Sequence, residues 1–114
     1  AQVEGGAIQG LGHAILEEVI LEDGVSKNPH LLDYKIPTTL DAPPVVVVLL
    51  ESGQGLGPFG AKGIGEPAMT PTPAAIMNAV SRAAGTPIVQ FPLTAERVLA
   101  ALKHPSPPWG ERAG

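Results

Sequence analysis

The chain of 114 residues carries a formal net charge of −4 and no cysteine, and 44% of it is hydrophobic. The acidic balance argues against a nucleic-acid partner, and without cysteine these residues cannot form disulfides, a thiolate zinc site or a cysteine-ligated iron–sulfur cluster. The longest apolar run, residues 45–50, is far shorter than the roughly 20 residues of a membrane-spanning helix. With 14 glycines and 13 prolines the chain is rich in loops, so we expect a piece that packs within something larger.

The first predicted element is a helix over about residues 3–18, where aliphatic residues recur at i, i+3 and i+7 from Ile8. Each glycine inside such a helix costs roughly 1 kcal/mol relative to alanine. We therefore expect tertiary contacts to hold this helix, with its glycines letting another backbone come close. The glycines in or beside the stretch are Gly5, Gly6, Gly10 and Gly12.

The next region favours extended structure. Residues 18–22 predict a short strand, and Asp23-Gly24 is a turn signal. Residues 28–44 predict an extended connection, in which residues 33–36 could pair as a strand. The β-branched run at residues 45–50 is the strongest strand signal, typical of a strand buried on both faces at the centre of a sheet.

A glycine-rich loop follows over residues 53–65. Residues 55–60 match G-x-G-x-x-G, but Pro58 prevents a helix from opening there and no acidic residue follows about 20 positions on. A P-loop is excluded as well, because Ala61 precedes Lys62 where that motif has glycine. The loop therefore does not predict a nucleotide site.

The end of this loop, residues 60–67, presents one carboxylate, Glu66, among three glycines. Pro67 disfavours the α region for the residue before it, which predicts an extended backbone at Glu66. Glycine lets the backbone approach another body closely. The pattern indicates a carboxylate on a backbone segment with few other side chains, which another molecule can approach closely. The alternative is a solvated loop charge.

Two more helices are predicted in the last third. Thr72-Pro73 forms a helix start with Thr72 as the N-cap, and Gly85 ends that helix. Residues 88–91 predict a short strand, and Thr94 caps a last helix through about Lys103. Residues 105–114 predict a disordered Pro-rich tail. The elements together predict an α+β fold with about three helices packed on a small mixed sheet.

Several short motifs, in order and at matching spacing from Ala1 to about Lys103, resemble the C-terminal part of the molybdopterin-binding large subunits of molybdenum hydroxylases. That family includes xanthine dehydrogenase, aldehyde oxidoreductase, isoquinoline oxidoreductase and aerobic carbon monoxide dehydrogenase. The motifs are Gln2–Gly6, Gln9–Gly12, Asp33–Thr38, Gly60–Pro67 and Pro92–Leu99.

The resemblance implies that residues 1–104 are a C-terminal segment of a larger molybdopterin-binding domain. It implies an enzyme that oxidises an aldehyde or an N-heteroaromatic carbon with water as the oxygen source. The implied cofactor is molybdenum–molybdopterin, with iron–sulfur clusters and FAD on other domains or subunits. A non-catalytic truncated or assembly module of the same family is the alternative.

The resemblance also implies site residues. Glu66 stands at the position of the catalytic base, and its flanking glycines suit that role because a base must come within hydrogen-bond reach of its proton. Gln2 corresponds to a glutamine beside the molybdenum centre, where an amide can donate without adding charge. Gly65 would allow close backbone approach, and Lys62 would steady the anionic cofactor or face solvent. No residue of the chain is expected to ligate the metal.

The implied partners are the remaining part of the molybdopterin-binding subunit, an iron–sulfur subunit, a flavin subunit and a small-molecule substrate. The resemblance implies a cytoplasmic protein, with the periplasm as the alternative. We also expect exposed apolar patches that favour self-association into a homo-oligomer.

Overall fold

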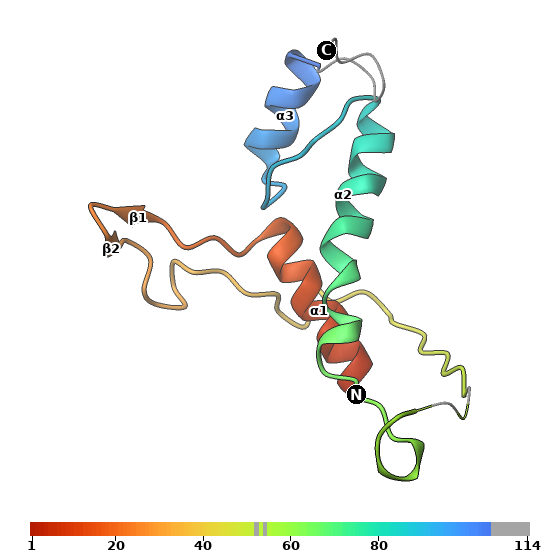
Figure 1. Ribbon diagram of the computed structural model, residues 1–114. Coiled ribbons are helices and arrows are strands. Elements are labelled where there is room, and N and C mark those ends of the chain that lie inside the picture. Colours follow the sequence, from red (N-terminus) through yellow and green to blue (C-terminus); the bar gives the residue numbers. More distant parts are fainter. Residues whose placement is uncertain (52, 54, 106–114) are drawn as a thin grey trace.

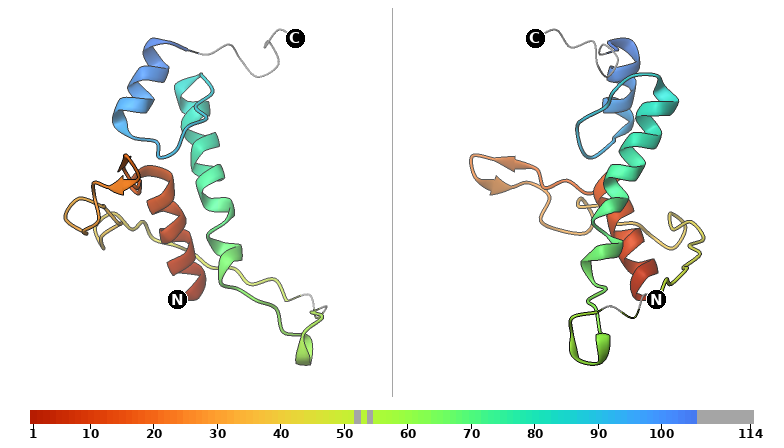
Figure 2. Two further views of the ribbon diagram at one scale, coloured as in Figure 1. Left: turned by 60° about the vertical axis from the view of Figure 1, so that its left-hand side comes forward. Right: turned by 45° about the vertical axis from the view of Figure 1, so that its right-hand side comes forward.

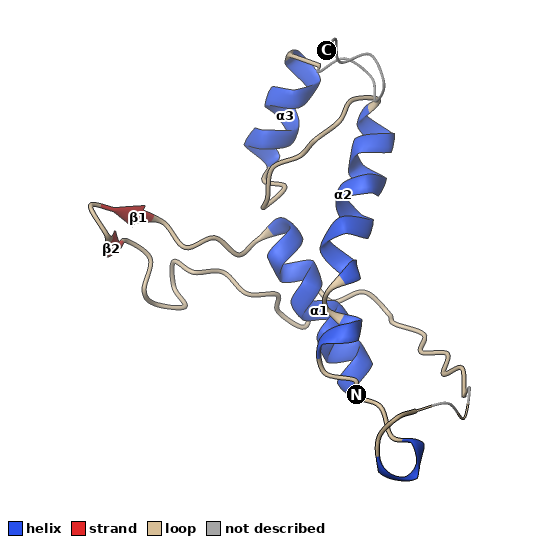
Figure 3. Ribbon diagram, in the orientation of Figure 1, coloured by secondary structure: helices blue, strands red, loops and turns tan. Residues whose placement is uncertain are grey.

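A computed structural model describes residues 1–51, 53 and 55–105 (Figure 1). The chain has an α+β fold, as predicted, in which three α-helices dominate and the small sheet is a two-stranded antiparallel hairpin (Figure 3). The hairpin and the glycine loop project from the helices in different directions (Figure 1). In chain order the elements are α1 (Gln2–Ile15), β1 (Leu21–Glu22), β2 (Val25–Ser26), the 3-10 helices η1 (Pro58–Gly60) and η2 (Glu66–Ala68), α2 (Pro71–Ala84) and α3 (Ala95–Lys103).

Helix α1 lies against α2 and η2 through buried glycines (Figures 1 and 2). A Cβ atom added at Gly10 would lie 2.6 Å from Thr72 Cβ and 2.9 Å from the carbonyl oxygen of Met69. One added at Gly6 would lie 2.8 Å from Ala68 Cβ. These distances are too short for any side chain, so the prediction that glycines allow a close backbone approach is confirmed. The helix ends at Ile15, earlier than predicted.

The predicted start of the second helix was wrong. Helix α2 begins at Pro71, and Thr70 rather than Thr72 occupies the N-cap position. Thr70 already has helical dihedral angles (φ −53°, ψ −45°) because the preceding η2 turn leads directly into the helix. The Thr72 hydroxyl instead donates to the carbonyl of Ala68 at 2.9 Å. The predicted end is confirmed, since Gly85 has the left-handed φ of 68°.

The strand predicted at residues 88–91 is also absent. The Ser81 hydroxyl accepts from the backbone N–H of Ile88 at 3.0 Å and donates to the Ile88 carbonyl at 3.3 Å. A side chain therefore takes the groups that a neighbouring strand would use. Downstream, the N–H of Leu93 donates to the carbonyl of Ala14 at 2.6 Å and ties the connection to α1.

Helix α3 begins as predicted, with Thr94 as its N-cap accepting from the N–H of Arg97 at 3.3 Å. The Arg97 guanidinium donates to Glu18 Oε1 at 2.6 Å and to the carbonyl of Pro92 at 3.0 Å. Glu18 follows α1 by three positions, so this residue pair docks the last helix onto the end of the first.

The hairpin confirms the predicted turn and shortens the predicted strand. Asp23 and Gly24 both have positive φ, 51° and 78°, as a two-residue hairpin turn requires. Behind the hairpin, the buried Asn28 side chain accepts from the N–H of Ile20 at 2.9 Å and donates to the carbonyl of Glu18 at 2.7 Å. One amide side chain thus closes the base of the hairpin.

Two other strand predictions were wrong. Residues 33–36 form a turn and a coil, and residues 45–50 are extended but pair with no strand in the part of the chain that the structure describes (Figure 3). A strand needs a hydrogen-bonded neighbour as well as β-branched residues. The hairpin, the only sheet among the described residues, does not supply that neighbour.

The buried apolar core is small. Among the described residues, the hydrophobic side chains that are buried are Ala14, Ile88 and Leu93. Leu40 and Leu50 are almost completely exposed, and many other large aliphatic residues are more than a third exposed. The expectation of exposed apolar patches is therefore confirmed. The predicted disordered tail, apart from Pro105, lies outside the described residues.

Tyr34 holds the extended connection against the end of α1. Its hydroxyl donates to Glu17 Oε2 at 2.7 Å, and this hydrogen bond to a carboxylate raises the pKa of Tyr34 above the usual 10.0. The stabilisation is fully present below the pKa of the unfolded chain and is lost as the pH rises through the higher folded pKa. Because the chain has one tyrosine, its absorbance on titration reports this group alone.

We therefore expect the tyrosine titration midpoint to lie above 10.0 in the folded chain and to fall in Glu17→Gln, which removes the charge that opposes ionisation. Asp33→Asn removes a neighbouring charge that makes no contact with the phenol, so it serves as the control. Identical midpoints in the parent chain and Glu17→Gln would contradict the assignment.

Candidate functional site

Glu66 is the first residue of η2, so the predicted extended backbone at this position was wrong. Its carbonyl accepts from the N–H of Met69 at 2.9 Å and from the N–H of Thr70 at 3.0 Å. Pro67 fits the turn because the early positions of a helix need no N–H partner. These hydrogen bonds fix the backbone from which the carboxylate projects.

The Glu66 side chain is exposed and has no hydrogen-bond or ion-pair partner within the described parts of the chain. A Cβ atom added at Gly63 or Gly65 would meet nothing within 4 Å. The backbone before Glu66 therefore has open space beside it. No hydrogen bond or ion pair of the described chain must break before the Glu66 carboxylate binds another molecule.

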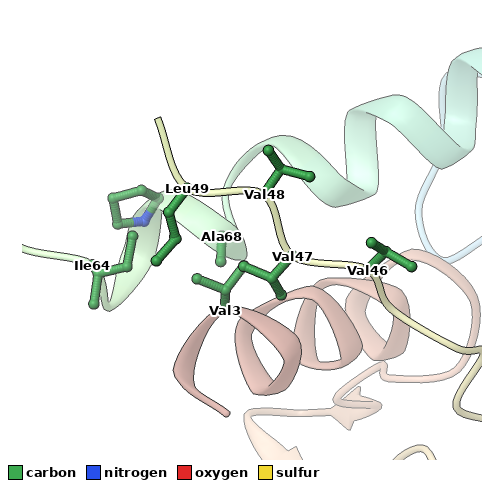
Figure 4. A pocket seen from close by; sticks show the side chains of 8 residues that line it. Val3, Val46, Val47, Val48, Leu49, Ile64 and Ala68 are labelled. Atoms are coloured by element: carbon green, nitrogen blue, oxygen red, sulfur yellow. The ribbon is translucent and has the colours of Figure 1, made fainter. Parts of the chain in front are cut away.

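An apolar groove with a volume of about 450 Å³ lies beside this turn (Figure 4). Val47 and Leu49 point toward Val3 at the start of α1, whereas Val46 and Val48 point the other way (Figure 4). The groove is lined by Val3, Val46, Val47, Val48, Leu49, Ile64, Pro67 and Ala68.

Three of the four predicted site residues are direct sequence neighbours of residues that line the groove. Gln2 directly precedes the lining residue Val3, and the pair Gly65-Glu66 lies between the lining residues Ile64 and Pro67. The beginning of α1 and the η2 turn thus bring these positions to one region. Lys62 is exposed in the stretch between η1 and η2 and does not line the groove.

Sequence reasoning missed the groove and one unusual loop residue. Phe59, in η1, has a positive φ of 55°, and its side chain is fully exposed. Its position between Pro58 and Gly60 was the available signal.

In residues 1–51, 53 and 55–105, no group of three or more His, Asp or Glu side chains could hold a metal ion. Among the helices of these residues, none combines the length and the apolar character that crossing a membrane requires.

Comparisons with known proteins give the class of this segment. The profile of the molybdopterin cofactor-binding domain matches residues 1–43. The chain is 43% identical over 99 residues to a putative xanthine dehydrogenase molybdenum-binding subunit of Escherichia coli K12, covering 85% of the chain and 13% of that protein. It is 38% identical over 103 residues to the aldehyde oxidoreductase of Megalodesulfovibrio gigas, covering 90% of the chain and 11% of that protein.

A solved structure agrees with these matches. The crystal structure of quinoline 2-oxidoreductase from Pseudomonas putida 86 superposes with a TM-score of 0.83 at 39% identity, covering 92% of this chain and 14% of that one. Fold and sequence therefore define a segment of a molybdenum-binding subunit. The chain belongs to the family of the molybdenum-binding subunits of xanthine dehydrogenase and aldehyde oxidoreductase, as its motifs predicted. Molybdenum–molybdopterin is the cofactor of that family, and the chain spans 11–14% of the length of these relatives.

Proposed function

We propose that the chain is a segment of a molybdenum hydroxylase and contributes Glu66 as the catalytic base. The whole enzyme would oxidise an aldehyde or an N-heteroaromatic carbon with oxygen from water. Residues 1–104 would form a C-terminal segment of the molybdopterin-binding domain. The observation that carries this proposal is the exposed Glu66 carboxylate, which has no partner in the described chain and stands on a ribbon with open space beside it.

The residues around Glu66 fit an anionic cofactor with bulky groups. Open space beside Gly63 and Gly65 would let such a body approach the main chain closely. Gln2, at the first position of α1, carries an amide that can donate a hydrogen bond without adding charge. Lys62 would add a positive charge four positions before Glu66. We propose Gln2, Lys62 and Gly65 as the cofactor-binding residues of this segment.

The bound cofactor would supply the redox chemistry, taking up the electrons released by the substrate carbon. Glu66 would accept, at a carboxylate oxygen, the proton released as the new carbon–oxygen bond forms. A positioned carboxylate within hydrogen-bond reach can do this and accelerates a reaction by about 10²–10⁴-fold.

The electrons would leave through iron–sulfur clusters and FAD on other domains or subunits, since this chain has no cysteine to hold a cluster. Its partners would be those polypeptides and the rest of the molybdopterin-binding subunit. We place the enzyme in the cytoplasm, with the periplasm as the alternative. A non-catalytic truncated or assembly module is the second candidate, favoured by the small core of the described residues.

The two candidates differ in metal content. The subunit that contains these residues, either as one polypeptide or as this chain co-expressed with the remainder, is purified and its molybdenum is measured. The hydroxylase proposal expects close to one molybdenum per subunit and oxidation of quinoline or an aromatic aldehyde. Assembly without molybdenum and without turnover would support the module and contradict the proposal.

A further inference from the structure

We propose that residues 45–50 form an interaction surface that adds, as a strand, to an exposed sheet edge of the remaining molybdopterin-binding subunit. The proposal rests on membership of the family and not on the catalytic role of Glu66. Each residue of the segment presents one N–H and one C=O, and within the described chain none of them has a partner.

The side chains of the segment alternate as those of a strand do. Val47 is 37% exposed, whereas Val46 and Val48 on either side of it are 88% and 77% exposed. Figure 4 shows the same alternation, with Val47 pointing toward Val3 on α1 and its neighbours pointing away. The face toward α1 is covered by the helical layer at Val47, whereas Leu49 on the same face is 68% exposed. The alternating direction of the side chains has the period of two of a strand.

The uncovered face is as apolar as the covered one. It consists of Val46, Val48 and Leu50, and Leu50 is 90% exposed. A strand that is apolar on both faces is typical of the interior of a sheet covered on both sides. An exposed edge of this kind in a finished protein would invite unwanted pairing and is normally paired or covered. The segment thus fits a strand that pairs with a sheet edge and has both of its faces covered.

The length of the relatives indicates that the remaining molybdopterin-binding subunit supplies the sheet edge. This chain spans 14% of quinoline 2-oxidoreductase, yet 92% of it superposes on that protein with a TM-score of 0.83. The fold of this chain is therefore found as part of a much larger chain. Strand addition suits such a partner because main-chain hydrogen bonds supply affinity while alternate side chains fill pockets.

Hydrogen exchange measured by mass spectrometry on the assembled subunit tests the proposal. We expect the amides of residues 46–50 to exchange roughly 100-fold more slowly than those of the same peptide in urea, because several ladder hydrogen bonds must open together. Exchange at the rate of the unfolded peptide in the assembled subunit would overturn it. Slow exchange in this chain alone that depends on its concentration, with a dimer in solution, would assign the edge to a second copy and also overturn it.

A matched pair of variants distinguishes the contribution of the backbone N–H at position 48 from that of the side chain. Val48→Pro removes an N–H that the ladder would need, whereas Val48→Thr keeps the N–H and a β-branched shape. We expect Val48→Pro to weaken assembly with the remaining subunit by at least about tenfold and Val48→Thr to weaken it less. Equal assembly by both variants would argue against a hydrogen-bonded ladder. Glu66→Gln should leave the exchange pattern unchanged, so this test and that of the catalytic role can fail separately.

Discussion

Glu66→Gln in the assembled enzyme is expected to lower kcat by about 10²–10⁴-fold while the molybdenum content stays unchanged. The amide keeps the size of the side chain but cannot accept the proton that the reaction releases. The exposed carboxylate makes no internal contact in the described chain, so its replacement should not disturb the fold. Steady-state turnover and metal analysis on the same preparation measure the two quantities.

Glu51→Gln is the control for that variant. Glu51 is also an exposed carboxylate and lies outside the η2 turn. Its replacement removes one negative charge from the same chain, so a general effect of charge would appear in both variants. Unchanged turnover in Glu66→Gln, with molybdenum bound, would reject this residue as the base.

Gly10→Ala is expected to lower the free energy of unfolding by about 1–3 kcal/mol, the usual result of overpacking a close contact. The added methyl group would lie 2.6 Å from Thr72 Cβ and 2.9 Å from the Met69 carbonyl oxygen, and the backbone atom cannot move aside as a flexible side chain could. The helices α1 and α2 would have to separate. Urea unfolding followed by circular dichroism measures the change.

Gly5→Ala on the same helix is the matched control. A Cβ atom there meets nothing within 4 Å, so alanine should only improve helix propensity. We expect the free energy of unfolding to rise by roughly 0.5–1 kcal/mol. If both variants shifted stability equally, the close approach at Gly10 would not be what holds α1 in place.

The helices could be predicted from the sequence because their signals are local. Thr94 and Gly85 act as caps through their own side chain and backbone, whatever surrounds them. The start of α2 was misplaced because Thr70 and Thr72 have the same chemistry and only the η2 turn decides between them. The strand signal at residues 45–50 gave an extended backbone without a ladder, because no strand among the described residues pairs with it.

The candidate site, like the fold, could be predicted from the sequence only in part. Glu66 stood out because its glycine-flanked motif is contiguous in the sequence. The groove beside it could not be predicted, since Val3, Val47 and Ala68 come from separate parts of the chain and meet only in the fold. The exposed, unpartnered state of the Glu66 carboxylate also required coordinates. The proposed roles of Gln2 and Lys62 rest on the resemblance and stay predictions.

The contact between Gly6 and Ala68 has an evolutionary consequence. Ala68 follows the proposed base by two positions, and main chain rather than a rotatable side chain sets its distance from α1. If Glu66 acts as the proposed base, this close approach would keep the carboxylate aligned while substrate-pocket side chains elsewhere in the enzyme change. New substrates could then be acquired without altering the proposed proton-transfer step.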